Sequence, residues 1–339
     1  MHRFLSMLVF GFAVCGLAEA QRPALQPPPV STFSIVAIDP SNGDLGVAVA
    51  SRYFSVGAVV PWALADVGAV ATQADVNVGY GPKGIDLLRQ GMSAPDVLKK
   101  LLAEDTFEGK EGRQVAIVDA HGNVAAYTGP HAPNWAGDRQ GKTWSAQGNI
   151  LAGPQVVESM GRAFEATPGE LAEKLYAAVK AGDEAGGDSR GKQSASMLVV
   201  RKQGGRNTNN DRYIYINVDD NPDPLVELRR LLDLNLGYLY QDKTFKLLGA
   251  GKSKEARDAA AREVRYWPNR GEAHVTLGLL DYATGDKDGA LAELKKARSL
   301  GGDAGFRRQF EAAAQRSAFK AILDDKPFLQ DLFGEQANR

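Results

Sequence analysis

The spacing of hydrophobic residues changes character along the chain. Up to about residue 218, short stretches rich in β-branched and small apolar residues alternate with pairs of stretches at helical spacing. The strand-like stretches are 32–38, 45–50, 57–60, 67–73, 113–118, 124–128, 143–147, 193–200 and 212–218. The helical stretches are 83–90, 94–103, 154–165, 170–181 and 224–240. Because strands follow one another as hairpins and helices come in pairs, we predict an α+β fold with two antiparallel sheets face to face and helices outside.

The C-terminal part has a different pattern. From about residue 244 to 316, Ala, Leu, Lys, Arg and Glu recur at helical spacing with no strand-like stretch. One tetratricopeptide-like helix pair, turning at 284–286, is indicated by Leu277, Gly278, Ala290, Leu294 and Ala297. A second repeat is degenerate, so we expect this segment to pack on the preceding domain or to be capped by a helix at 306–323. We therefore predict a domain at 32–240 and a helical, tetratricopeptide-like region at 241–339.

The N-terminal residues have the features of an export signal. His2 and Arg3 precede an apolar stretch at 4–17, and residues 18–20 form a small-x-small cleavage signature. This predicts a signal peptide at 1–20, with an apolar stretch too short to span a bilayer. Residues 21–31 contain four prolines, which indicates an extended leader. We expect an exported protein, periplasmic or secreted, with no integral membrane segment after signal cleavage.

Composition and charge exclude several kinds of partner. The formal net charge is −1, so there is no basic field to gather nucleic acid or anionic lipid. The single cysteine, Cys15, lies in the predicted signal peptide, so the mature chain would have no disulfide and no thiol catalysis. No pair among His121, His131 and His274 has metal-ligand spacing. We expect no metal, no cofactor and no nucleic-acid partner.

Two glycine-rich stretches resemble nucleotide-binding motifs but lack their context. Residues 79–84 spell G-x-G-x-x-G outside a βαβ pattern, which favours a tight turn before a helix; alternatively, that helix start offers backbone N–H groups to a substrate carboxylate. Residues 186–193 nearly spell a P-loop, but Gln193 replaces the Ser or Thr that would hold magnesium, and a strand follows. The second stretch is then a loop rich in polar residues. Loops of functional sites and solvated turns both have such a composition.

Several stretches, taken in order along the chain, resemble one bacterial family. They are 31–37 (STFSIVA), 45–51 (LGVAVAS), 67–74 (VGAVATQA), 147–153 (QGNILAG), 186–195 (GGDSRGKQSA) and 225–232 (LVELRRLL). Together they cover nearly all of 32–234 and resemble the domain of unknown function 1028, which is placed in the N-terminal-nucleophile (Ntn) hydrolase superfamily. The resemblance implies an Ntn-hydrolase-type four-layer α/β/β/α sandwich whose first strand presents an N-terminal nucleophile.

The resemblance also implies a set of site residues. The catalytic residues would be Thr32, Asn149 and Asp188. The Thr32 hydroxyl would attack an amide carbonyl, its freed α-amine of pKa about 7.7 to 8.0 would act as general base, and Asn149 with the backbone near Gly148 would stabilise the oxyanion. The substrate-binding residues would be Arg190, Thr72, Gln73, Gln193 and Ser194.

A free Thr32 requires processing of the chain. Many relatives begin with Met followed by this Thr, whereas cleavage after Ala20 leaves eleven residues ahead of Thr32. A second cut between Ser31 and Thr32 is then needed. With that cut, we predict an exported amidohydrolase acting on a small amide or peptide-like substrate, with the helical repeat serving homo-oligomer assembly or a protein partner. Without it, the chain would be a binding protein whose helical repeat docks a peptide or cell-wall partner.

Overall fold

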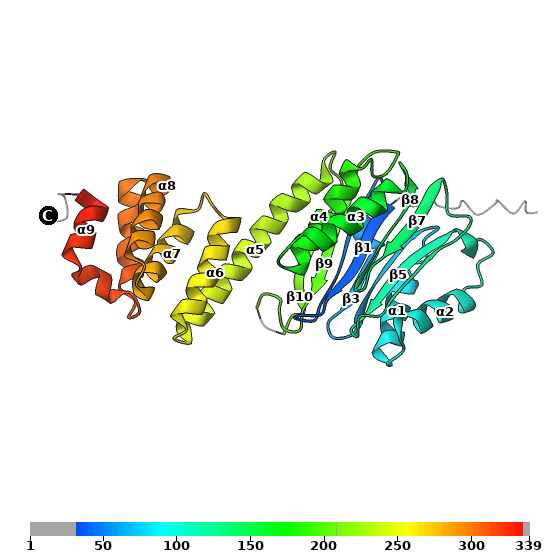
Figure 1. Ribbon diagram of the computed structural model, residues 1–339, viewed down its shortest axis with the longest axis horizontal. Helices are drawn as coiled ribbons and strands as arrows, with labels where there is room; N and C mark the ends of the chain where they lie inside the picture. The colour runs from blue at the N-terminus through cyan, green and yellow to red at the C-terminus, as the bar shows by residue number, and fades with distance from the viewer. Residues whose placement is uncertain (1–31, 208, 335–339) are drawn as a thin grey trace, which may run out of the picture.

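The computed structural model describes residues 32–207 and 209–334. A part built on β-sheets lies at one end of the long axis, and a helical arm that carries the C-terminal residues lies at the other (Figure 1). The predicted signal peptide and leader, at 1–31, lie outside the described residues.

Two antiparallel sheets form the first part. The larger has six strands in the spatial order β10 (Arg212–Val218), β9 (Ser194–Val200), β2 (Asp44–Ser51), β1 (Thr32–Asp39), β8 (Trp144–Leu151) and β7 (Trp135–Gln140). The smaller has four, in the order β3 (Pro61–Leu64), β4 (Gly68–Ala74), β5 (Arg113–Asp119) and β6 (Val124–Thr128). Together with the helices, these sheets confirm the predicted α+β class.

Helices cover the outer face of each sheet (Figure 1). The smaller sheet packs against α1 (Tyr80–Arg89) and α2 (Ala94–Glu104). The larger sheet packs against α3 (Gln155–Ala166), α4 (Leu171–Glu184) and the first half of α5 (Pro224–Gly249). A third apolar core lies between the two sheets.

Alternation along β1 decides which side chains enter which core. Phe33 and Ile35 pack against α3 and α4, whereas Val36 belongs to the core between the sheets. Since successive strand residues point to opposite faces, Thr32 and Ser34 share the face of Val36 and look toward the smaller sheet.

Two elements differ from the sequence-based prediction. The stretch 57–60, predicted as a strand, is replaced by a short 3-10 turn at Val56–Ala58, with β3 following it. The edge strand β7 was not predicted, because its sequence WAGDRQ contains no β-branched residue. Pairing with β8 gives β7 its strand conformation, so tertiary context overrides weak local propensity.

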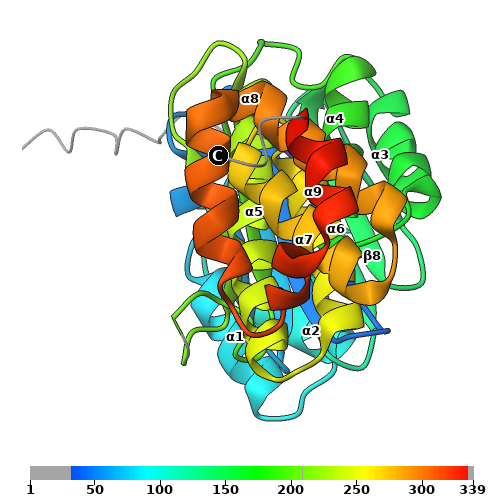
Figure 2. The ribbon, with the colours of Figure 1, turned by 90° about the vertical axis from the view of Figure 1, so that its left-hand side faces the viewer.

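The helical arm continues from α5. This helix packs on the larger sheet through Leu228 and Leu232, and it runs without a break across residue 240, where the sequence placed a boundary. It is followed by α6 (Ser253–Tyr266), α7 (Gly271–Thr284), α8 (Lys287–Ala314) and α9 (Lys326–Phe333), which are seen from the end of the arm in Figure 2. These helices share their own apolar core. Gly285 turns α7 into α8 at φ +96°, and Gly302, at φ +65° and ψ 161°, interrupts α8.

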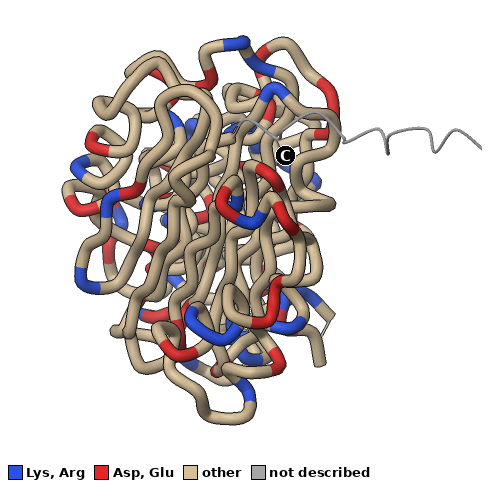
Figure 3. Tube along the Cα trace, turned by 90° about the vertical axis from the view of Figure 1, so that its right-hand side faces the viewer, with Lys and Arg blue, Asp and Glu red and all other residues tan. Residues whose placement is uncertain are grey.

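The surface charge is mixed in sign. Seen from the end opposite the helical arm, acidic and basic residues intermingle along the loops (Figure 3), which matches the formal net charge of −1. None of the helices within the described residues is both long and apolar enough to cross a membrane.

Candidate active site

Thr32 is the first residue of β1, which lies between β2 and β8 in the larger sheet. The register of β1 places Thr32 opposite Ser51 of β2 and opposite Asn149 of β8. The Thr32 side chain is buried, and its Oγ1 lies 3.1 Å from Ser51 Oγ. A hydroxyl on one neighbouring strand and a carboxamide on the other therefore flank Thr32.

A group of buried polar side chains, here called the polar network, fills the space between the sheets beside Thr32. Its members are Ser34, Gln73, Gln114, Gln147 and Asn149. The Gln73 Nε2 donates to the Thr32 carbonyl oxygen at 3.2 Å and to Gln114 Oε1 at 2.8 Å. The same Gln114 Oε1 accepts from Asn149 Nδ2 at 3.1 Å, and Ser34 Oγ donates to Gln73 Oε1 at 2.6 Å. Because these bonds join β1 and β8 of one sheet to β4 and β5 of the other, they hold the Thr32 end of the two sheets in a fixed relation.

Strained backbone follows two members of this network. Ala74, directly after Gln73, has φ +64°, and Ile150, directly after Asn149, has φ +52°. A positive φ is rare for a β-branched residue and costs roughly 1 to 3 kcal/mol. The strain at Ile150 is held by the following loop, because the Ser189 N–H and hydroxyl both donate to the Ile150 carbonyl, at 3.0 and 2.9 Å. Such strain persists where surrounding contacts over-determine the backbone, and it concentrates at functional sites.

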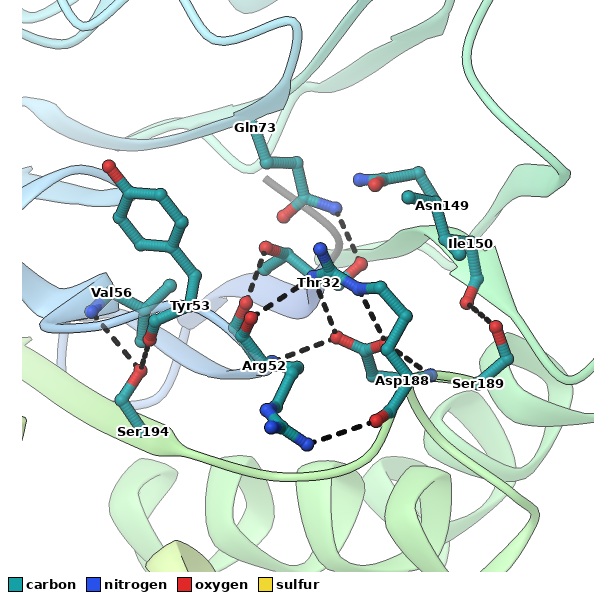
Figure 4. Close-up of polar contacts among 12 residues, drawn as sticks. Thr32, Arg52, Tyr53, Val56, Gln73, Asn149, Ile150, Asp188, Ser189 and Ser194 are labelled. Carbon is teal, nitrogen blue, oxygen red and sulfur yellow. Dashed lines mark hydrogen bonds and ion pairs between the residues drawn. The ribbon is translucent and has the colours of Figure 1, made fainter. Parts of the chain in front are cut away.

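The polar loop at 186–193 lies against the ends of β1 and β2. Asp188 Oδ2 accepts from the Arg52 backbone N–H at 2.8 Å, and Asp188 Oδ1 accepts from the Arg190 backbone N–H at 2.9 Å. The Arg190 guanidinium pairs with Asp188 at 3.2 Å, where the Asp188 side chain is 1% exposed and the Arg190 side chain 34%. The Asp188 carboxylate points toward Thr32 (Figure 4). The loop thus brings a buried acid to the strand end and leaves a partly exposed arginine beside it.

Two further contacts hold this loop in place. Arg52 and Arg190 exchange bonds, each guanidinium donating to the other's carbonyl at 3.2 Å. Gly187 has φ +48°, and a Cβ there would lie 3.2 Å from the Phe33 ring. A side chain at this position would be strained at this φ and tight against Phe33, so glycine suits the turn and the close approach to β1.

A cavity of about 420 Å³ opens next to this loop. Its lining includes Phe33, Ser51, Asp188, Ser189, Lys192 and Leu225. Lys192 Nζ donates to Asp183 Oδ2 at 2.7 Å on the rim. The cavity therefore reaches Ser51, the residue bonded to Thr32, and it has room for a small ligand.

The structure brings together some of the predicted site residues and separates others. Thr32, Gln73, Asn149, Asp188 and Arg190 gather at one end of the sheets, as described above. Thr72 lies on the other face of β4, where its Oγ1 donates to the Asn77 carbonyl at 3.2 Å. The Gln193 backbone N–H donates to the Ser51 carbonyl at 3.0 Å, whereas its side-chain Nε2 donates to Asp220 Oδ1 at 3.1 Å. Ser194 donates to the Tyr53 carbonyl and accepts from the Val56 N–H at 3.2 Å, so it anchors the turn after β2.

Sequence reasoning missed several residues of the site. They are Ser34, Ser51, Arg52, Gln114 and Gln147. A signal for Gln114 exists in the alternation of β5, where Ala116 and Val118 face the core between the sheets and Gln114 shares their face. A large polar side chain in such a position must find partners inside the protein. Which partners it finds cannot be read along a single strand.

The G-x-G-x-x-G stretch at 79–84 has a structural explanation. It begins α1, and Gly81 lies so close to the Trp62 indole that a Cβ would be 2.3 Å from the ring. Tyr80 donates its hydroxyl proton to Asp105 Oδ2 at 2.6 Å, and Arg113 Nε donates to the same oxygen at 3.0 Å. Burial raises the pKa of Asp105, but these two hydrogen bonds, the Phe107 backbone N–H and the Arg113 charge together lower the pKa to about 2. This charged cluster fastens the helix start to the smaller sheet.

The fold and the buried polar site define a two-sheet α+β domain with a polar network between its sheets. Residues 32–228 match the family of unknown function DUF1028, and the chain belongs to this family. The chain is also similar to the crystal structure of a Silicibacter pomeroyi protein assigned to the same family, with 31% identity, a TM-score of 0.54, and coverage of 60% of this chain and 84% of that one. No curated protein sequence matches the chain.

Proposed function

We propose that this protein is an exported amidohydrolase of the Ntn-hydrolase superfamily, with Thr32 as its nucleophile. In this proposal the two sheets and their outer helices are the four-layer α/β/β/α sandwich of that superfamily. The observation that carries it is the position of Thr32. It is the first residue of a central strand, its hydroxyl lies 3.1 Å from Ser51 Oγ, and the polar loop at 186–193, which carries Asp188, adjoins it.

The proposed reaction uses the terminus that a cut between Ser31 and Thr32 would create. The Thr32 hydroxyl attacks the amide carbonyl, and its proton passes to the neutral α-amine and then to the leaving amine. Ser51, as the hydroxyl partner of Thr32, relays or orients that proton. Water then hydrolyses the ester on Thr32 and releases the acid product.

The neighbouring groups supply electrostatic support in this proposal. The Asn149 carboxamide and the backbone near Gly148 donate to the oxyanion, and one such donor is typically worth about 3 kcal/mol. Asp188 holds the Arg52 and Arg190 segments in place, and so acts as a positioning residue. Arg190, partly exposed at the loop, suits a carboxylate at the far end of the substrate. The cavity volume of about 420 Å³ favours a small amide or a short peptide.

The remaining parts of the chain have proposed roles in export and assembly. Residues 1–20 would be the signal peptide and 21–31 a leader removed by the second cut. The helical arm would be a tetratricopeptide-like region that binds a protein partner or a second copy of the chain. Packing of α5 on both the larger sheet and α6 supports a rigid attachment of this arm.

The test begins with the natural N-terminus. Protein recovered from the exporting host is examined by intact mass and N-terminal sequencing, and a panel of amide substrates is then screened with wild type, Thr32→Ser and Thr32→Ala. We expect a chain that starts at Thr32, hydrolysis of at least one amide, weaker hydrolysis by Thr32→Ser and none by Thr32→Ala. A chain that never starts at Thr32, or full hydrolysis by Thr32→Ala, would refute the proposal.

A binding protein is the alternative, and one observation favours it. In the uncut chain Thr32 is fully buried, so it also fits a simple packing role at the start of a strand. In that case the cavity beside the 186–193 loop would bind its ligand without cleaving it. The same sequencing experiment separates the two, because the binding protein needs no cut before Thr32.

A further inference from the structure

A second cavity lies in the helical arm, far along the chain from the Thr32 site. Its volume is about 440 Å³, and it lies among α5, α6, α7 and α8. The polar side chains lining it include Gln241, Glu263, Trp267, Arg270, Glu272 and Gln309. All of them follow residue 228, where the family match ends.

Glu263 brings a buried carboxylate to this cavity. The residue is 1% exposed, and its Oε1 accepts from Gln241 Nε2 at 3.1 Å. Its Oε2 has no hydrogen-bond partner among the described residues. Burial raises the pKa of Glu263 to about 7, although the Gln241 hydrogen bond and the Arg270 charge lower it, while Asp242 adds to the rise. A buried acid that lacks a partner for one oxygen is a frequent feature of ligand sites.

Trp267 brings a buried donor to the same wall. It lies one helical turn after Glu263, is 5% exposed, and its Nε1 also has no hydrogen-bond partner among the described residues. The ring is locked on several sides: it makes an edge contact with Tyr238 at 4.6 Å between centroids, and the Arg270 guanidinium lies 3.8 Å from its centroid. A Cβ at Gly237 would lie 2.1 Å from the indole, so α5 also packs directly on it. Trp267 therefore cannot easily turn its N–H toward another partner within the fold.

Groups that can donate to an anion lie at the same cavity, beside the Glu272 carboxylate, which accepts from Gln309 Nε2 at 2.9 Å. Gly271 and Glu272 line it and form the first turn of α7, where backbone N–H groups and the helix dipole favour an anion. Arg270, which precedes them, stacks on the Trp267 ring, and a stacked guanidinium keeps its N–H groups in a plane from which they can reach a carboxylate. The cavity thus combines an acceptor of positive charge at Glu263 with donors to negative charge at Trp267, Arg270 and the start of α7.

We infer that this cavity binds a small zwitterion of the α-amino acid type, either a free amino acid or a short peptide. The ligand ammonium group donates to Glu263 Oε2, and the ligand carboxylate accepts from the Trp267 N–H, the Arg270 guanidinium and the first turn of α7. This arrangement gives hydrogen-bond partners to both Glu263 Oε2 and Trp267 Nε1. It also places each charged end of the ligand beside the cavity groups of opposite character. The inference does not depend on the proposed hydrolase.

The experiment uses the full protein as recovered from its exporting host, at pH 8, where Glu263 is mainly ionised. Thermal shift with the free L-amino acids and with glycylglycine identifies a ligand, and calorimetry measures its affinity. The amide and the N-acetyl derivative of that ligand, which lack the carboxylate and the ammonium group respectively, are measured beside it. We expect binding of at least one zwitterion and at least about tenfold weaker binding of each derivative, a difference of about 1.4 kcal/mol.

Variants connect the binding to the cavity. Glu263→Gln keeps the shape of its side chain, and Trp267→Phe keeps an aromatic ring but removes the indole N–H; each should weaken binding at least about tenfold. Glu255→Gln, on the exposed first turn of α6, should leave it unchanged. Circular dichroism and the unfolding temperature without ligand show that the variants are folded. The inference is overturned if no amino acid or glycylglycine binds, if either derivative binds as well as its parent, or if binding survives Glu263→Gln.

Discussion

The hydroxyl of Thr32 lies 3.1 Å from the hydroxyl of Ser51, across the register that pairs β1 with β2. Both residues are buried, and the next residue, Arg52, donates its N–H to Asp188. A single strand pairing therefore links the candidate nucleophile, a second hydroxyl and the polar loop at 186–193. Each link can be tested separately.

Ser51→Ala should lower amide hydrolysis while changing stability little. The variant removes the buried hydrogen bond to Thr32, worth about 1 kcal/mol, but leaves the strand pairing intact. Hydrolysis of the identified substrate and urea unfolding are measured together. The control is Ser145→Ala, because Ser145 Oγ is buried on β8 without a partner among the described residues and its loss should cost nothing. Equal activity of the two variants would remove Ser51 from the mechanism.

Gln114→Leu should destabilise the protein by roughly 1 to 3 kcal/mol. The substitution keeps the volume but removes the oxygen that accepts from both Gln73 and Asn149. Urea unfolding gives the free-energy change. Gln140→Leu, at an exposed position of the edge strand β7, is the control and should change stability by less than about 0.5 kcal/mol. A neutral Gln114→Leu would show that the polar network does not stabilise the sheet pair.

Ala74→Gly should leave stability unchanged or raise it slightly. At φ +64° an alanine is strained and a glycine is not, and this gain of about 0.4 to 1 kcal/mol offsets the lost methyl group. Ala71→Gly, three residues earlier on the same strand, lacks that compensation and should cost about 1 kcal/mol or more. Unfolding in urea compares the two. Equal destabilisation of both would mean that Ala74 carries no backbone strain in solution.

Stability should fall as the pH rises through the range set by Glu263. Burial raises the pKa of this carboxyl from 4.5 to about 7, so between these values the folded protein keeps a proton that the unfolded chain has lost. Since the unfolded state then binds fewer protons, the free energy of unfolding decreases from about pH 4.5 to about pH 7 and levels off above it. The expected loss is roughly 1 to 3 kcal/mol.

Glu263→Gln removes this titration. The free energy of unfolding of the variant minus that of wild type should be larger at pH 8 than at pH 5. Urea unfolding of both proteins at the two pH values measures this difference. Glu255→Gln should follow the wild-type pH profile. If Glu263→Gln also follows it, Glu263 titrates as an ordinary exposed acid.

The sequence by itself determined the local elements and the family of the domain. Alternating apolar residues specified the central strands, and helical spacing specified the paired helices, because both periods follow from backbone geometry. The ordered stretches from 31 to 232 were sufficient for the family, which the match at 32–228 shows. Turn residues also located the break between α7 and α8, since a glycine such as Gly285 adopts a positive φ without strain.

Only the tertiary structure decided which polar residues meet. Thr72 and Gln73 are adjacent in sequence, but strand alternation sends Thr72 to Asn77 and Gln73 to Thr32. Gln114 joins the site because β5 packs opposite β8, a pairing between sheets that no single strand encodes. Glu263 and Trp267 read in sequence as parts of an ordinary helix, and their exclusion from water depends on how α5, α7 and α8 surround them. Local periodicity fixes which face a side chain takes, whereas its partners depend on contacts between segments far apart in the chain.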